Sequence, residues 1–151
     1  MTRVLFVCTG NTCRSPMAEA ILKSRNLPGI EVKSAGVYAM DGSAASENTR
    51  KVLLENGILF DTHQSSMLND ELVNWTSYVI TMTASHKAAV INMFPMAAAK
   101  TFTLKEFAAE NNNSDIVDPF GGSIEQYRQT YNELSDMIIK MIQRLQIEDR
   151  K

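Results

Sequence analysis

Residues 4–16 read VLFVCTGNTCRSP, and this stretch indicates both the fold and the place of its most reactive side chains. Its first four residues are apolar and include two valines, which is typical of a strand buried on both faces of a parallel sheet. Ser15 followed by Pro16 indicates a helix start, with serine as the N-cap and proline at the first helical position. A strand, a loop over residues 8–14 and a helix are therefore predicted in succession.

Strand and helix patterns alternate along the rest of the chain. Further strands are predicted at 31–35, 78–82 and 100–104. Helices are predicted to begin after Ser46, Asn69 and Thr83, and a last helix carries apolar side chains three and four positions apart from Tyr127 to Leu145. Such alternation predicts one α/β domain over residues 1–151, with a doubly wound sheet whose ligands bind beyond the carboxyl ends of the strands.

The overall composition excludes several classes of protein. Of the 151 residues, 44% are hydrophobic, which is enough for an ordinary buried core. A net charge of -2 and a pI near 5.7 give no basic surface for nucleic acid. No apolar run reaches the roughly 20 residues of a membrane helix, and the first residues do not resemble a signal peptide. We therefore expect a cytoplasmic protein with neither nucleic acid nor membrane as a partner.

The reactive side chains are few. Two cysteines, Cys8 and Cys13, share one loop, and the two histidines, His63 and His86, lie far along the chain. This is not the cysteine pattern of a disulfide-rich secreted domain. A structural zinc site needs about four ligands, so we expect no metal and no other cofactor. His86 is expected on the surface of a helix.

The loop that begins at Cys8 has the composition of an anion-binding nucleophile site. A thiolate attacks phosphorus far better than a thiol, and we expect Arg14 and the helix N-terminus to lower the pKa of Cys8. Arg14 can also bind two phosphoryl oxygens at once. Gly10 provides backbone freedom and Asn11 tolerates a left-handed conformation, so that successive N–H groups can converge on one anion. The Ser15 hydroxyl can donate to the Cys8 sulfur. The predicted substrate-contacting loop residues are Thr9, Gly10, Asn11, Thr12, Cys13 and Ser15.

The segment from Val7 to Pro16 resembles the signature of the low-molecular-weight protein-tyrosine-phosphatase family, and the similarity extends over nearly the whole chain. A second landmark of that family is an Asp-Pro pair near the last helix, found here as Asp118-Pro119. The resemblance implies a three-layer domain with a four-stranded parallel sheet flanked by helices and a phosphate-binding loop after the first strand. It further implies a metal-independent phosphatase, and a polar network of Asn11, Ser34 and His63 beneath the loop.

Asp118 is the candidate general acid and base. A carboxylic acid near the loop can protonate the leaving group and then accept a proton from the water that hydrolyses phosphocysteine. Spacing alone leaves an ordinary turn residue equally open, and the family resemblance favours the catalytic role. Asp115 is the neighbouring alternative.

Two positions bear on the substrate. Thr12 and Phe120 resemble the protein-arginine-phosphatase branch of the family. Phosphotyrosine members usually carry a bulky aliphatic residue at the position of Thr12 and a tyrosine at the position of Phe120. We therefore expect hydrolysis of phosphoarginine in proteins, with Asp118 pairing with the guanidinium group. The alternatives are a protein-tyrosine phosphatase and a Thr12 that only satisfies the loop backbone.

Three other functions are weighed against hydrolysis. Arsenate reduction in its thioredoxin-linked form uses further cysteines downstream, and none follows Cys13. A phosphocysteine carrier would preserve its intermediate, whereas Arg14 and Asp118 would promote turnover. A phosphate-sensing module, with Cys8 incidental, would release no product.

Cys13 suggests redox control of the nucleophile. Oxidised Cys8 could form a disulfide with Cys13 and so escape irreversible oxidation, and the alternative is that Cys13 is a small residue chosen for packing. The expected partners are phosphorylated proteins, and the expected oligomeric state is a monomer.

Overall fold

The computed structural model describes residues 1–108 and 115–149. Within them, strands lie in one parallel sheet in the order β2-β1-β3-β4. The strands are β1 (Thr2–Cys8), β2 (Ile30–Gly36), β3 (Tyr78–Thr81) and β4 (Thr101–Thr103). The central strand β1 pairs on both sides, and its residues 4–7 have no exposed surface. The predicted four-stranded parallel sheet is confirmed, as is the burial of the first strand.

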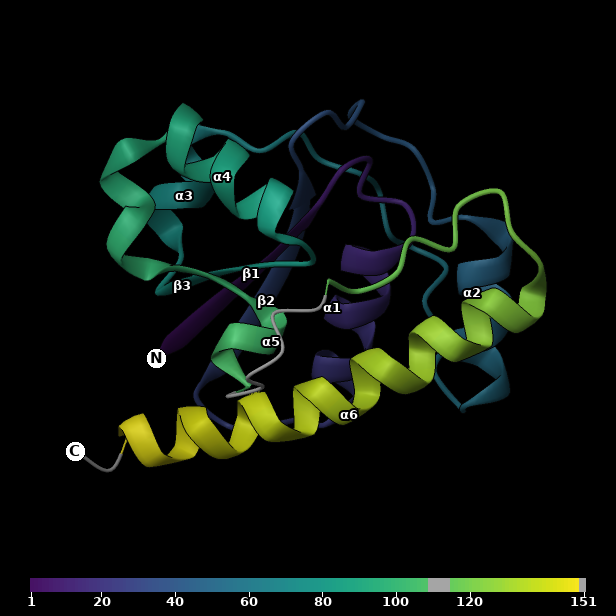
Figure 1. The fold of residues 1–151 in the computed structure, drawn as a ribbon. Helices are drawn as coiled ribbons and strands as arrows, with labels where there is room; N and C mark the ends of the chain where they lie inside the picture. The colour runs from purple at the N-terminus through teal and green to yellow at the C-terminus, as the bar shows by residue number, and fades with distance from the viewer. Residues whose placement is uncertain (109–114, 150–151) are drawn as a thin grey trace.

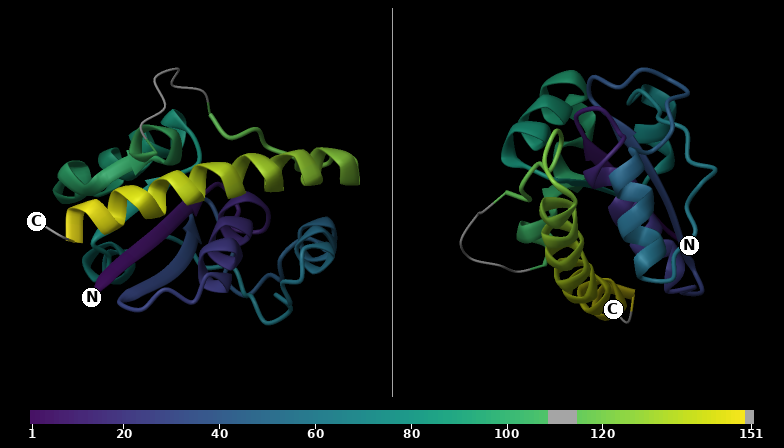
Figure 2. Two further views of the ribbon diagram at one scale, coloured as in Figure 1. Left: turned by 90° about the horizontal axis from the view of Figure 1, so that it is seen from below. Right: turned by 90° about the vertical axis from the view of Figure 1, so that its right-hand side faces the viewer.

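The helices cover both faces of this sheet (Figure 1). They are α1 (Arg14–Ser24), α2 (Glu47–Glu55), α3 (Asp70–Trp75), α4 (Ala84–Met93), the 3₁₀ helix η1 (Pro95–Lys100), α5 (Leu104–Phe107) and α6 (Ile124–Asp149). On one face α1, α2, α5 and α6 enclose a core that includes Phe6, Met17 and Leu134. On the other face α3, α4 and η1 pack over Leu5, Val7 and Val79 of the sheet. Helices on both faces of the sheet confirm the predicted three-layer arrangement. Figure 2 shows α6 running along the domain.

Local caps account for most helix starts. The side chains of Ser46, Asn69 and Thr83 each accept a backbone N–H from the first turn of the helix that follows. The three predicted helix starts are confirmed, as is the predicted cap at Ser46. The short helix α5 was not predicted, although Thr103 and Glu106 form a reciprocal capping box there.

The predicted N-cap of the first helix is wrong. Helix α1 begins at Arg14, and its cap residue Cys13 makes no side-chain capping bond. The Ser15 hydroxyl lies inside the helix and contacts the Cys8 sulfur instead. The first turn of α1 is therefore part of the loop that follows β1.

The end of β2 supports the loop that begins at Cys8. Backbone N–H groups of Val37 and Tyr38 donate to the carbonyls of Cys8 and Thr9, each at 3.0 Å. This approach requires a glycine at position 36, because a Cβ there would lie 2.3 Å from the Thr9 carbonyl oxygen. The sheet thus places the loop at the carboxyl ends of its strands, where ligands bind in such folds. Among the residues described, no helix combines the length and apolar character needed to cross a membrane.

Candidate active site

A cavity of about 220 Å³ opens above the loop that follows β1. Two distant segments form it: the loop and the start of α1, and the segment that precedes α6. Its lining residues are Cys8, Thr9, Gly10, Thr12, Cys13, Arg14, Asp118 and Phe120. The structure thus brings most of the predicted site residues into one cavity.

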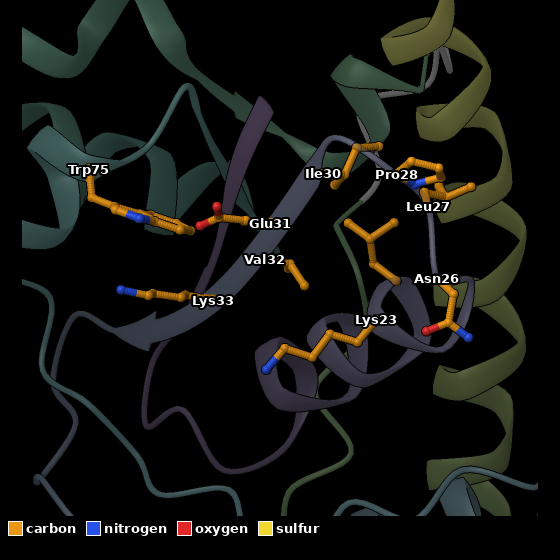
Figure 3. Close-up of a pocket in the computed structure, with 10 residues that line it drawn as sticks. Lys23, Asn26, Leu27, Pro28, Ile30, Glu31, Val32, Lys33 and Trp75 are labelled. Carbon is orange, nitrogen blue, oxygen red and sulfur yellow. The ribbon is translucent and has the colours of Figure 1, made fainter. Parts of the chain in front are cut away.

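A larger groove of about 580 Å³ lies elsewhere, along the first half of β2 (Figure 3). It is lined by the end of α1, by Glu31 and Lys33, and by Trp75, over whose ring the Lys33 ammonium lies at 4.4 Å. It is at the opposite end of β2 from the cysteine loop, and no cysteine or arginine lines it. We therefore assign the chemistry to the smaller cavity.

Cys8 is the nucleophile candidate, and its sulfur lies 2.8 Å from the Ser15 hydroxyl. Burial raises the pKa of the Cys8 thiol. The Ser15 hydroxyl, the backbone N–H groups of Ser15 and Asn11, and the Arg14 charge all act in the opposite direction. The lowered pKa that we expected from the sequence is therefore wrong, because loss of solvation outweighs these donors. These donors and the Arg14 charge are the groups that stabilise the thiolate form of Cys8.

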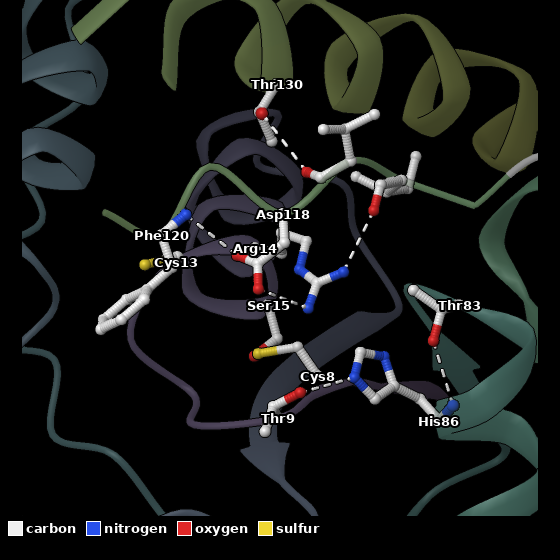
Figure 4. Close-up of polar contacts among 12 residues, drawn as sticks. Cys8, Thr9, Cys13, Arg14, Ser15, Thr83, His86, Asp118, Phe120 and Thr130 are labelled. Atoms are coloured by element: carbon white, nitrogen blue, oxygen red, sulfur yellow. Dashed lines mark hydrogen bonds and ion pairs between the residues drawn. The ribbon is translucent and has the colours of Figure 1, made fainter. Parts of the chain in front are cut away.

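Arg14 is held in place by two contacts (Figure 4). Its Nη1 donates to the Ile116 carbonyl at 3.1 Å, and its Nη2 lies 3.5 Å from the Asp118 carboxylate. The Arg14 side chain is buried, whereas the Asp118 side chain is 52% exposed. A phosphoryl group bound over the loop can take the Arg14 donors and release Asp118 toward the leaving group.

Asn11 fixes the shape of the loop. Its φ of 58° is left-handed, as the sequence led us to expect, and its side chain is fully buried. Its Nδ2 donates to Ser15 at 2.8 Å and to Ser34 at 2.9 Å, and His63 Nε2 donates to its carbonyl at 2.9 Å. Asn11, Ser34 and His63, which the family resemblance grouped together, do form one hydrogen-bonded network.

Glu19 completes this network and was missed from the sequence. It is buried on α1, accepts a hydrogen bond from the Ser34 hydroxyl, and lies 3.9 Å from His63 Nδ1. Lys23 also contacts its carboxylate, at 2.6 Å. A glutamate on a helix is ordinarily exposed, so its local sequence carried no signal of this role.

Thr12 and Cys13 face different surroundings. The Thr12 carbonyl accepts the Ser46 N–H, whereas its hydroxyl, among the described residues, makes only a long contact of 3.8 Å to the Cys13 sulfur. The Cys13 sulfur lies 3.6 Å from both the Ser46 and the Tyr127 hydroxyls. Burial and the contact with Cys13 raise the pKa of Tyr127 to about 12. Both cysteines are free thiols in the structure.

The segment before α6 presents Asp118 and Phe120 to the cavity. The Phe120 N–H donates to the Asp118 carboxylate at 3.0 Å, and the Phe120 side chain is 75% exposed at the cavity mouth. A tight turn at Gly121, with φ of 77°, follows them. Asp115 does not line the cavity, and its carboxylate instead accepts the backbone N–H of Ala84 at 2.9 Å. Asp118 is therefore the better-placed acid.

His86 is not the surface residue that the sequence led us to expect. It is 6% exposed, and its Nε2 lies 2.8 Å from the Thr9 hydroxyl oxygen. Burial and the nearby Arg14 charge lower the pKa of His86 to about 4. The ring is therefore neutral at neutral pH. The sequence carried no signal for this contact, because Thr9 and His86 come from different elements.

A metal site is not evident. Within residues 1–108 and 115–149, no three histidine, cysteine, aspartate or glutamate side chains are grouped as metal ligands would be.

Comparison with known proteins identifies the family of this chain. The profile of the low molecular weight phosphotyrosine protein phosphatase family matches residues 3–151. A protein-arginine-phosphatase of Geobacillus stearothermophilus is 51% identical over 97% of each chain. A protein-tyrosine-phosphatase, PtpB of Staphylococcus haemolyticus, is 37% identical over 92% of this chain and 96% of its own. The solved YwlE arginine phosphatase, a cysteine-to-serine mutant with a phosphorylated active-site serine, superposes with a TM-score of 0.94 at 39% identity over 99% of each chain.

Proposed function

Because this chain belongs to the low molecular weight phosphotyrosine protein phosphatase family, whose members are cysteine-dependent phosphatases, we propose that it hydrolyses phosphoarginine in proteins through a phosphocysteine intermediate. The observation that carries this proposal is one cavity that holds Cys8, Arg14 and Asp118 together with Thr12 and Phe120. The first three supply the chemistry, and the last two surround the place of the leaving group.

In the first step the Cys8 thiolate attacks phosphorus. A sulfur–phosphorus bond forms while the phosphorus–nitrogen bond breaks, and Asp118 gives its proton to the leaving guanidine nitrogen. The Arg14 guanidinium and the loop N–H groups stabilise the charge that develops on the phosphoryl oxygens. Arg14 is already oriented for this by its bond to the Ile116 carbonyl.

In the second step a water molecule attacks the phosphocysteine. The Asp118 carboxylate accepts a proton from the water as the oxygen–phosphorus bond forms. The sulfur–phosphorus bond breaks, and Cys8 leaves as a thiolate stabilised by the Ser15 hydroxyl at 2.8 Å. Inorganic phosphate is released and the site returns to its starting protonation state.

The preference for phosphoarginine is supported by the cavity walls. The Thr12 hydroxyl makes no short hydrogen bond within the described residues, and it lines the cavity, so it is available to the N–H groups of the substrate. Asp118 can form a bidentate pair with a departing guanidinium group, which a phenol does not offer. The Geobacillus relative named as a protein-arginine-phosphatase is also more similar to this chain than the Staphylococcus tyrosine phosphatase is, at 51% against 37% identity.

The test is a paired measurement of kcat/KM on a phosphoarginine peptide and a phosphotyrosine peptide of the same sequence. We expect a preference for phosphoarginine of at least about tenfold, because a site that hydrogen-bonds its substrate rejects an analogue that lacks the groups. Thr12→Ile should remove or reverse the preference, whereas Thr12→Ser should retain most of it. Equal turnover of the two peptides by the unchanged protein would refute the phosphoarginine assignment and leave the tyrosine-phosphatase alternative.

We further infer that the enzyme is a cytoplasmic monomer whose partners are phosphorylated proteins, with no nucleic acid among them. The net charge of -2 supports the last point, because it provides no general attraction for a polyanion. Oxidation of Cys8 to a disulfide with Cys13 is a further proposal, supported by the presence of both thiols on the wall of one cavity.

A further inference from the structure

Thr9 and His86 form a contact that the proposed chemistry does not use. Thr9 follows the nucleophile directly and lines the cavity. Its hydroxyl oxygen lies 2.8 Å from His86 Nε2, and Figure 4 shows this bond beside the Cys8 side chain. A hydroxyl at this position can rotate freely unless a neighbour occupies one of its lone pairs or takes its proton.

The His86 ring is held by a rigid part of the fold. His86 lies in the first turn of α4, where its backbone N–H donates to the Thr83 cap at 3.1 Å. In the same turn the backbone N–H of Ala84 binds Asp115, which precedes the segment that carries Asp118. The first turn of α4 therefore anchors both the cysteine loop and the acid segment.

The unpaired nitrogen of His86 indicates which tautomer is present. Nδ1 is buried and has no hydrogen-bond partner among the residues described. An orphaned buried N–H is rarer than an orphaned buried acceptor, so the nitrogen without a partner is the one expected to carry no proton. The ring is neutral at neutral pH, since its pKa is lowered to about 4, so it carries one proton only. That proton belongs on Nε2, which then donates to the Thr9 oxygen.

We propose that His86 is a positioning residue that donates its Nε2–H to Thr9 and so directs the Thr9 hydroxyl proton to a phosphoryl oxygen bound over the loop. With one of its lone pairs occupied by His86, the Thr9 oxygen presents its own proton to the cavity. The substrate would then receive one side-chain donor from Thr9 in addition to Arg14 and the loop N–H groups. This inference rests on the proposed anion site and adds a contact to it.

The experiment measures the dissociation constant of inorganic phosphate by titration calorimetry, which does not depend on turnover. Thr9→Val removes the hydroxyl from an exposed residue and should weaken phosphate binding about tenfold, the loss expected for one hydrogen bond to a charged group. Thr9→Ser should restore most of that affinity. His86→Phe should weaken binding comparably, and the double variant Thr9→Val with His86→Phe should bind no worse than either single variant.

A second readout concerns the ring itself. The chain has two histidines, so a long-range ¹H–¹⁵N spectrum at pH 7 shows the signals of two imidazole rings. The set of signals that disappears in His86→Gln belongs to His86. We expect the Nε2–H tautomer. The Nδ1–H tautomer, or additive effects of the two substitutions on phosphate binding, would overturn the inference.

The two proposals fail separately. If the unchanged protein released no phosphate from a phosphoarginine peptide, the proposed function would be rejected, while the tautomer and the phosphate titrations would still decide the role of His86. Normal turnover with unaltered phosphate binding in Thr9→Val would reject the role of His86 alone.

Discussion

Replacing Ser15 with alanine tests what keeps the Cys8 sulfur reactive. The Ser15 hydroxyl lies 2.8 Å from that sulfur, and it opposes the burial that raises the pKa of Cys8. Ser15→Ala removes this donor and leaves the sulfur buried. A hydrogen bond to a charged group contributes about 1.5–3 kcal/mol, so the pKa should rise further and the thiolate fraction at pH 7 should fall by about tenfold to a hundredfold.

The assay is the rate of alkylation of Cys8 by iodoacetamide across a range of pH, because only the thiolate reacts at an appreciable rate. We expect the rate profile of Ser15→Ala to move to higher pH. The kcat/KM for an aryl phosphate at pH 7 should fall by a similar factor, since the same thiolate attacks phosphorus.

A matched control is Ser24→Ala on the same helix. The Ser24 hydroxyl donates to the Ile21 carbonyl at 2.7 Å and lies outside the cavity, so its removal should leave both the alkylation profile and turnover unchanged. An alkylation profile of Ser15→Ala that coincides with that of the unchanged protein would refute the reasoning, provided that thermal unfolding shows both variants folded.

Four further predictions follow from the site. Asp118→Asn should lower kcat on a phosphoarginine peptide by roughly 10²- to 10⁴-fold. The loss on an aryl phosphate should be smaller, because its better leaving group needs less protonation. Equal losses on both substrates would argue against an acid role. After peroxide treatment, a thiol reductant should restore activity to the unchanged protein but not to Cys13→Ser, and mass spectrometry should find the Cys8–Cys13 linkage only in the former. The pKa of His86 is about 4 in the folded protein and 6.5 in the unfolded chain, so only the unfolded chain takes up a proton between these two pH values. The free energy of unfolding should therefore fall as the pH drops from 6.5 to 4. In denaturant titrations, His86→Phe should flatten that part of the pH curve. Gly36→Ala should disrupt the loop and abolish most phosphate binding, because the added Cβ would meet a loop carbonyl oxygen at 2.3 Å, and unaltered phosphate affinity would contradict this.

Most of the fold followed from local patterns. The apolar run of β1 predicted a strand buried on both faces, and Ser46, Asn69 and Thr83 predicted the starts of three helices. Each of these signals depends on residues close together in the chain, so it can be detected without the tertiary structure. The same applies to the left-handed backbone of Asn11, which the loop composition suggested.

The prediction of Ser15 as an N-cap was wrong although its local signal was clear, whereas its predicted contact with the Cys8 sulfur is present. Serine before proline favours an N-cap, but in the structure the Ser15 hydroxyl contacts the Cys8 sulfur and accepts from Asn11. Helix α1 begins one residue before Ser15, at Arg14, whose guanidinium donates to the Ile116 carbonyl. Tertiary contacts in the loop thus overrode a local preference worth about 1 kcal/mol.

The sequence by itself determined the reactive groups and their order: a cysteine after a strand, an arginine at the following helix, and a distant aspartate before proline. Only the tertiary structure decided the environment of those groups. It buried Cys8 deeply enough to raise its pKa, placed Glu19 beneath the loop, and turned His86 from an expected surface residue into a partner of Thr9. The physical reason is that solvation and hydrogen bonding depend on which side chains meet in space, and these pairs are brought together by the packing of separate elements around one sheet.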